Sequence, residues 1–151
     1  MHLLSVDPGI KNFAYVVLDV HTHSVCCGDT IPVRIWGEDD EHSAVRIVNL
    51  VKALIDIWHP VRGCVEFQAL SQVTRGIQQA TVAAMVAFGV PCHVVYPATI
   101  KSYYPQLGFR GHTKNKEAAE DLVQAMGYGA LENHLADAIV QGLYVLNEKN
   151  F

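Results

Sequence analysis

The chain has 151 residues, of which half are apolar and 17% are charged, and its formal net charge is −4. This composition is that of a globular protein and excludes a disordered chain, and the length predicts a single domain, 1–151, with a full core. The negative charge argues against a general polyanion binder but leaves room for a local basic surface.

The first part of the chain predicts three strands. Three segments are rich in β-branched and aromatic residues: 2–7, 13–19 and 24–33. Pro8-Gly9 and a polar turn at 21–23 separate them, and such turns are typical of antiparallel neighbours. We therefore expect a three-stranded antiparallel meander.

Alternating helices and strands follow. Apolar residues at helical spacing predict a helix over 43–58, which Pro60 ends. The later elements are expected in this order: a strand over 61–67, a helix over 70–88 broken early by Gly76, a strand over 91–96, a turn led by Pro97, a loop rich in glycine and basic residues over 105–113, and helices over 114–126 and 134–147. A meander followed by β-α-β-α predicts an α/β fold with a five-stranded mixed sheet and helices on both faces.

Three carboxylates stand where charge is unusual. Asp7 closes the first apolar strand before a Pro-Gly turn, Glu66 follows an apolar pair in the fourth strand, and Asp137 lies near the start of the last helix. Burying an unpaired carboxylate is costly, so such a residue usually has a cation beside it. His134 is three residues before Asp137 and shares its helix face. Together these elements predict a divalent-metal phosphodiester hydrolase.

These motifs resemble the RuvC family of Holliday junction resolvases. Asp7-Pro8-Gly9 on the first strand, Val65-Glu66 on the fourth, and His134-x-x-Asp137 opening the last helix follow the family's order and spacing. Pro97-x-x-x-Lys101 and the lysines before the 114–126 helix also fit. The resemblance spans nearly the whole chain and implies a ribonuclease H-like fold. Val65-Glu66-Phe67-Gln68 and the short chain look most similar to the resolvases of poxviruses and related large DNA viruses.

The resemblance implies a site that holds two Mg²⁺ or Mn²⁺ ions. Two divalent ions about 3.5–4 Å apart can activate a water and stabilise the leaving 3′ oxygen. Asp7 would bridge both ions, Glu66 would hold one and Asp137 the other. Many family members carry an acid at the position of His134, and imidazole suits Mn²⁺ better than Mg²⁺. His134 is therefore a candidate ligand or base, with a surface histidine as the alternative.

Contacts with DNA are expected around this site. The densest basic stretch surrounds Arg110, Lys114 and Lys116, where Lys and Arg can pair with phosphates, although a solvated helix start is the alternative. The other candidates are Lys11, Asn12, Phe67, Gln68, Arg75 and Lys101. Phe67 can either pack in the core or stack on a base, and Lys11 and Asn12 can be plain turn residues.

The function expected is a structure-selective endonuclease that resolves four-way DNA junctions as a homodimer, because two symmetric incisions need two sites related by a two-fold axis. An apolar face of the 70–88 helix, with Ile77, Val82, Met85 and Phe88, is the candidate interface, unless the monomer's own core buries it. The alternatives are a ribonuclease H-like nuclease acting on a flap, fork or RNA–DNA hybrid, and a non-catalytic relict of the fold.

The chain's start and its cysteines bear on the compartment. Because the first strand begins almost at once, we expect neither a signal peptide nor, unless one was removed, a presequence. No apolar run approaches the ~20 residues needed to span a membrane. Cys26, Cys27, Cys64 and Cys92 show no zinc spacing and favour free, buried thiols. We expect an intracellular, soluble protein of the cytoplasm or, if viral, of a viral replication site.

Overall fold

The computed structural model describes residues 1–34, 37–69, 71–107 and 112–148, and for 112–116 it describes the backbone alone. A five-stranded sheet forms the centre of the described part. Its strands are β1 (His2–Asp7), β2 (Phe13–Asp19), β3 (Val25–Ile31), β4 (Arg62–Glu66) and β5 (Cys92–Val95), in the order β3-β2-β1-β4-β5. The bounds lie within two residues of those predicted, because each strand carries an apolar pattern between turn residues.

The sheet is mixed, as predicted. β1 pairs antiparallel with β2, and β2 pairs antiparallel with β3. β4 is parallel to both β1 and β5. Val6 pairs with Val65 in the ladder between β1 and β4, so the next residues, Asp7 and Glu66, end neighbouring strands at the same edge of the sheet.

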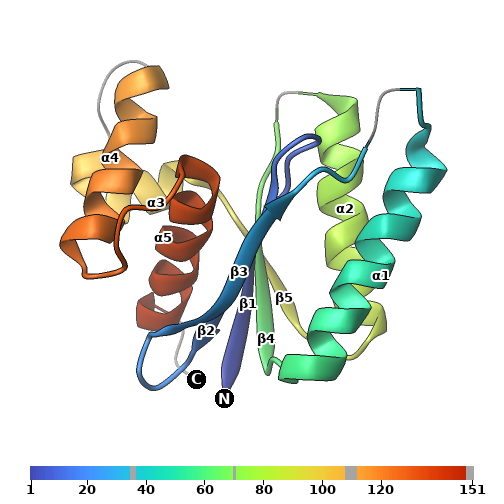
Figure 1. Ribbon diagram of the computed structural model, residues 1–151, viewed down its shortest axis with the longest axis horizontal. Helices are drawn as coiled ribbons and strands as arrows, with labels where there is room; N and C mark the ends of the chain where they lie inside the picture. The colour runs from blue at the N-terminus through green and yellow to red at the C-terminus, as the bar shows by residue number, and fades with distance from the viewer. Residues whose placement is uncertain (35–36, 70, 108–111, 149–151) are drawn as a thin grey trace.

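Helices cover both faces of the sheet (Figure 1). The helices are α1 (Asp40–Trp58), α2 (Gln72–Ala87), α3 (Pro97–Tyr103), α4 (His112–Ala125) and α5 (Asn133–Glu148), with a short 3₁₀ helix η1 (Pro105–Leu107). α1 and α2 pack together on one face, and α5 lies on the other face against β1 and β2, with α3 and α4 outside it. The α/β fold with a five-stranded mixed sheet is confirmed.

The sheet separates two apolar cores. Leu4 and Val6 of β1 point into the core beneath α1 and α2, whereas Leu3 belongs to the core beneath α5. Ile77 and Met85 of α2 are also buried in the first of these cores. The candidate interface is therefore wrong and its alternative holds: the monomer's own core buries Ile77 and Met85, and Val82 and Phe88 pack against that core.

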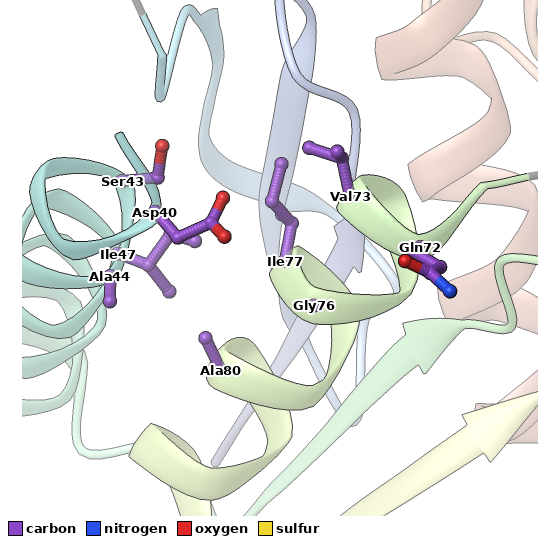
Figure 2. Close-up of a pocket in the computed structure, with 9 residues that line it drawn as sticks. All are labelled: Asp40, Ser43, Ala44, Ile47, Gln72, Val73, Gly76, Ile77 and Ala80. Carbon is purple, nitrogen blue, oxygen red and sulfur yellow. The ribbon is translucent and has the colours of Figure 1, made fainter. Parts of the chain in front are cut away.

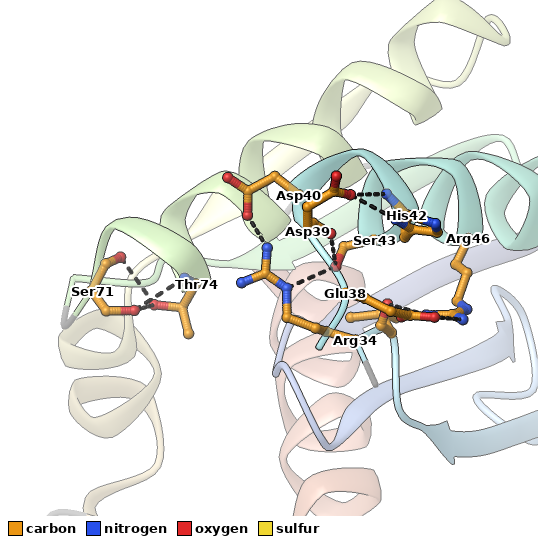
Figure 3. A network of polar contacts seen from close by, with 10 residues as sticks. Arg34, Glu38, Asp39, Asp40, His42, Ser43, Arg46, Ser71 and Thr74 are labelled. Carbon is orange, nitrogen blue, oxygen red and sulfur yellow. Dashed lines mark hydrogen bonds and ion pairs between the residues drawn. The ribbon is translucent and has the colours of Figure 1, made fainter. Parts of the chain in front are cut away.

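Polar side chains fix the starts of α1 and α2 (Figure 3). The Asp39 carboxylate caps α1 by accepting from the backbone N–H of His42 at 3.1 Å, and the Ser71 hydroxyl caps α2 by accepting from that of Thr74 at 3.1 Å. Two ion pairs tie the connection between β3 and α1 to the helix: Arg34–Asp40 and Arg46–Glu38. These contacts set where both helices of this face begin.

Three predicted features differ from the structure. Gly76 does not break α2, because a glycine costs a helix only about 1 kcal/mol and the next residues, Ile77 and Gln78, are buried. Pro97 does not lead a turn but occupies the first position of α3, where its missing N–H costs no helical hydrogen bond. Of the predicted loop over 105–113, residues Pro105–Leu107 form η1 and α4 already begins at His112.

The four cysteines are free, as predicted. Cys64 is buried, and burial raises the pKa of its thiol to about 11, whereas Cys26, Cys27 and Cys92 are half-buried rather than buried. Among the described residues, no helix has both the length and the apolar character to cross a membrane.

Candidate active site

The three predicted carboxylates meet at one edge of the sheet. Asp7 and Glu66 reach it as the last residues of two parallel strands, and α5 begins over the same edge at Asn133. All three, with His134, line one pocket of about 540 Å³. Residues far apart in the chain are therefore brought together as the sequence predicts.

Asp7, His134 and Asp137 form the tightest part of this cluster. One ligand atom from each lies within 4.8 Å of the others. His134 Nδ1 is 3.3 Å from Asp7 Oδ2, and Asp7 is buried, with 8% of its surface exposed. The contact with Asp7 raises the pKa of the His134 imidazole, because the carboxylate stabilises the charged ring. Two carboxylates and an imidazole at this spacing are a set of donors suited to a divalent cation.

Glu66 completes the cluster from β4. Burial, and then the neighbouring negative charges of Asp7 and Asp137, raise the pKa of this carboxyl group well above its ordinary value. A proton at this site relieves the crowding of negative charge, and a bound cation would relieve it more strongly. Burial and the acidic neighbours therefore destabilise the charged form of Glu66, which a neighbouring cation would stabilise.

Side chains of the following loop orient Glu66. The Gln68 side-chain amide donates to Glu66 Oε2 at 3.1 Å, and the backbone N–H of Gln68 donates to Oε1 of buried Gln78 at 2.7 Å. Gln78 thus ties the loop to α2, and Gln68 ties the loop to the Glu66 carboxylate. Gln68 was predicted to contact DNA, but in this structure its side-chain amide donates a hydrogen bond to Glu66.

Glu132 fixes the start of α5. Its carboxylate accepts from the backbone N–H groups of His134 and Leu135, at 3.0 and 2.9 Å, and from the Thr30 hydroxyl of β3 at 2.6 Å. These hydrogen bonds satisfy helix N–H groups that otherwise have no partner. Sequence reasoning missed Glu132, although an acid two residues before His134 is a recognisable capping signal.

The rim of the pocket carries other predicted DNA contacts. Phe67 lines the pocket and stacks on Tyr96 with ring centroids 4.7 Å apart, and Tyr96 is itself exposed. Phe67 is half-buried, so it lies between the two predicted alternatives of core packing and an open stacking surface. Lys101 is exposed and also lines the pocket.

The remaining candidates lie farther out. Lys11 and Asn12 are exposed in the turn between β1 and β2, beside Gly9, and Arg75 is exposed on α2. A Cβ on Gly9 would lie 2.5 Å from the Asn12 carbonyl oxygen, so the turn requires glycine. The side chains of Lys114 and Lys116 and the whole of Arg110 lie outside the described residues.

A second pocket lies between α1 and α2 (Figure 2). It has a volume of about 280 Å³, and its lining includes Ile47, Ile77 and Ala80, with Asp40 and Gln72 at its polar part. Among the residues that the structure describes, this pocket has one ionisable residue in its lining, Asp40. It lacks the clustered donors that make the first pocket a candidate site.

Comparisons with known proteins give matches in structure. No protein-family model matches the sequence, and no curated protein matches it. The structure of RuvC from Thermus thermophilus superposes with a TM-score of 0.74 at 21% identity, over 95% of this chain and 92% of that one. A complex of fowlpox virus resolvase with its substrate Holliday junction DNA superposes with a TM-score of 0.65 at 17% identity, over 97% of both chains.

A third similar structure is the yeast mitochondrial Holliday junction resolvase Ydc2, with a TM-score of 0.62 at 15% identity, over 95% of this chain and 75% of that one. The bacterial RuvC gives a higher TM-score than the viral resolvase, so the finer placement among viral resolvases stays a prediction. The sequence resemblance and the superpositions agree on the architecture: the chain has the ribonuclease H-like fold of RuvC-type resolvases.

Proposed function

We propose that this protein is an endonuclease that resolves four-way DNA junctions by divalent-metal-dependent hydrolysis of phosphodiester bonds. One observation carries the proposal: Asp7, Glu66, His134 and Asp137 meet in one pocket, at the same edge of a fold shared with proteins solved in complex with Holliday junctions. Fold alone does not fix function, so the argument depends on the side chains of this pocket.

The residues present fit a hard divalent cation. Carboxylate oxygens are the donors that Mg²⁺ and Mn²⁺ prefer, and the imidazole of His134 adds a donor that favours Mn²⁺. Asp7, Asp137 and His134 would hold the metal, with Glu66 as a further ligand that gives up its proton on binding. When bound, the metal would supply an activated water and stabilise the charge that develops at the phosphate.

The chain's own residues would position the substrate. A pocket of about 540 Å³ admits the phosphate and sugar groups at the scissile bond, and exposed Lys101 at its rim can pair with a flanking phosphate. Half-buried Phe67 and exposed Tyr96 lie ring against ring and offer an aromatic surface beside the carboxylates, where an unpaired base of a branched substrate can stack. These groups favour branched DNA over an intact duplex, whose bases are not available for stacking.

A second copy of the chain would provide the second incision. The 16 residues of α2 include one charged residue, Arg75, and the other exposed side chains of the outward face are uncharged. Exposed residues of this face are Gln72, Arg75, Gly76, Gln79, Ala83, Val86 and Ala87. A nearly uncharged helix face suits a self-complementary contact about a two-fold axis. We therefore place the dimer interface on this outer face of α2 instead of on Ile77 and Met85.

A panel of substrates tests the proposal. The full chain would be incubated in Mg²⁺ and in Mn²⁺ with a synthetic four-way junction, and separately with a duplex, a flap, a fork and an RNA–DNA hybrid of matched sequence. We expect paired nicks placed symmetrically across the junction and much slower cleavage of the other substrates. Preferential cleavage of the flap, fork or hybrid would support the alternative nuclease, and cleavage of none would support the non-catalytic alternative. The proposed substrate implies an intracellular site of DNA recombination.

A further inference from the structure

The contact between β1 and α5 contains a second polar layer behind the carboxylates. Ser5 and Asp7 are two positions apart on β1, so their side chains point to the same face of the sheet, toward α5. On α5, His134 contacts Asp7, and Gln141, seven positions later, contacts Ser5. Ser5 is 0% exposed and Gln141 is 1% exposed. A buried polar pair in an otherwise apolar core requires hydrogen bonds to offset the loss of hydration.

Hydrogen bonds join this pair to both elements. The Gln141 side-chain amide donates to Ser5 Oγ and to the backbone carbonyl of Val6, both at 3.1 Å, and lies 3.6 Å from the sulfur of Cys64 on β4. The Ser5 hydroxyl in turn donates to the carbonyl of Ala138 on α5 at 2.7 Å. One glutamine thus connects α5 with the two strands that carry Asp7 and Glu66.

The helix approaches the sheet closely at this point. A Cβ on Gly142 would lie 2.5 Å from Leu18 Cδ1 and 3.2 Å from Ser5 Cβ, so the glycine allows α5 to lie nearer β1 than another residue would. Apolar packing alone is not directional, whereas hydrogen bonds weaken steeply with distance and angle. A slide of α5 by one residue, about 1.5 Å, would therefore disrupt the Ser5–Gln141 contacts.

We propose that Gln141, acting through Ser5 and the Val6 carbonyl, is a positioning residue that fixes the register of α5 along β1. This register sets how far His134 and Asp137 lie from Asp7, and so determines the geometry in which the cluster binds a divalent cation. Gln141 is not among the residues that line the pocket, so its effect on the cluster would be transmitted through β1. The inference deepens the proposed function, because it assumes that this cluster is the metal site.

The test compares two buried polar residues on opposite faces of the sheet. Gln141→Leu removes the hydrogen bonds and keeps most of the volume. Thr81→Val is the matched control: Thr81 is also 0% exposed, but its hydroxyl bonds to the Ile77 carbonyl within α2 at 2.7 Å, away from the cluster. Both substitutions are expected to lower the free energy of unfolding, so stability alone does not distinguish a positioning role from a structural one.

The distinguishing readout is the affinity for Mn²⁺, measured by isothermal titration calorimetry on folded protein without DNA. We expect Gln141→Leu to weaken Mn²⁺ binding by about 10-fold, as removal of supporting groups around a metal site commonly does, and Thr81→Val to leave it unchanged. In single-turnover cleavage of a junction, Gln141→Leu should lower the rate at saturating DNA and leave the affinity for DNA unchanged. Wild-type Mn²⁺ affinity in folded Gln141→Leu protein would overturn the proposal.

Ser5→Ala examines the same contact from β1 with a smaller change. If Gln141→Leu does not fold, Ser5→Ala decides the question: weaker Mn²⁺ binding supports the proposal, and wild-type binding overturns it. If both fold, the double variant should bind Mn²⁺ about as weakly as Gln141→Leu alone, because the two residues act through one contact, whereas additive losses would contradict this. If the wild-type protein binds Mn²⁺ but cuts no junction, the proposed function is refuted. The Mn²⁺ affinities of the variants would still show whether Gln141 positions the metal ligands.

Discussion

His134 and Asp7 lie 127 residues apart in the chain and meet with Nδ1 and Oδ2 at 3.3 Å. The contact joins the start of α5 to the end of β1, and Asp137, one helical turn on, joins it from the same face of the helix. A protonated imidazole of His134 and a divalent cation would both interact with the Asp7 carboxylate. Protonation of this cluster and binding of a divalent cation are therefore expected to compete.

The first prediction concerns Glu66 and the stability of the metal-free protein. Because the pKa of Glu66 is raised in the folded state, the folded protein binds more protons than the unfolded chain between the ordinary pKa of a glutamate, about 4.3, and the raised one. Stability should therefore fall as pH rises through this window. Glu66→Gln, which carries no titratable group there, should lose less stability from pH 6 to pH 8, as measured by urea unfolding in EDTA.

Adding metal completes this test. Mn²⁺ should raise the stability of the wild type at pH 8, because a cation offsets the clustered charge, and should raise that of Glu66→Gln much less. The raised pKa of His134 contributes in the same direction in both proteins: its stabilising effect is present below about pH 6.5 and is lost as pH rises through the raised pKa. The difference between the proteins thus isolates Glu66, and identical pH dependence would contradict its place in the cluster.

The second prediction concerns His134. His134→Ala should lose most of the cleavage activity, and His134→Asp should keep a substantial part, because a carboxylate also binds Mg²⁺ and Mn²⁺. Wild-type activity should fall at low pH as the imidazole becomes protonated, whereas the aspartate variant should stay active to lower pH. Single-turnover rates from about pH 5.5 to 9 in each metal would measure this.

His42 provides a matched control for that experiment. An aspartate partner, Asp39, also raises the pKa of His42, but the pair lies at the start of α1, outside the set of residues that line the carboxylate pocket (Figure 3). His42→Ala should leave the pH profile of cleavage unchanged. If His134→Ala behaves like His42→Ala and cleaves as the wild type does, the three carboxylates suffice and His134 has no part in the chemistry.

The third prediction concerns DNA affinity and salt. Neutralising Lys114 and Lys116 together should weaken junction binding and reduce the slope of log affinity against log salt by about one to two units, as expected when one or two phosphate contacts are lost. Lys52→Ala is the control, because Lys52 pairs with Asp56 on the opposite helical layer. An unchanged slope in the double variant would show that these lysines belong to a solvated helix start.

The fourth prediction concerns the proposed dimer. Val86 on the outer face of α2 is 57% exposed, and Ile57 on α1 is 67% exposed. Val86→Glu would place two negative charges against each other across a two-fold interface and should shift the protein toward monomers, whereas Ile57→Glu should not. Light scattering over a range of concentrations measures this. A wild type that is monomeric throughout, or a Val86→Glu protein that dimerises normally, would remove α2 as the interface.

Much of the fold and of the site could be predicted because its signals are local. Asp7 and Glu66 each end an apolar strand, and parallel neighbours bring their ends to one edge of the sheet. His134 and Asp137 share a helix face by spacing alone. α3 was missed because Pro97 suits a turn as well as a first helical position, and only packing of Ile100 beneath the helix decides between them.

The supporting residues were missed because their partners are distant in sequence. Gln141 bonds to Ser5 across 136 positions, and Glu132 bonds to Thr30 across 102. A glutamine on an apolar helix face and a serine within an apolar strand each look unremarkable alone. The predicted dimer surface was wrong for a related reason. An apolar helix face can pack on a sheet or on a partner chain, and Ile77 and Met85 pack on the sheet.

Cleavage of a four-way junction by the wild type and by Asp7→Asn, compared in Mg²⁺ and in Mn²⁺, tests the central claim most directly. Asp7 is the buried carboxylate that contacts His134, and replacing it with asparagine removes the charge that would hold the metal while nearly keeping its shape. We predict metal-dependent, symmetric nicking by the wild type and a loss of at least ~100-fold in the variant, with folding and junction binding retained. An Asp7→Asn protein that cleaves the junction as fast as the wild type would contradict the assignment of Asp7 to a catalytic metal site.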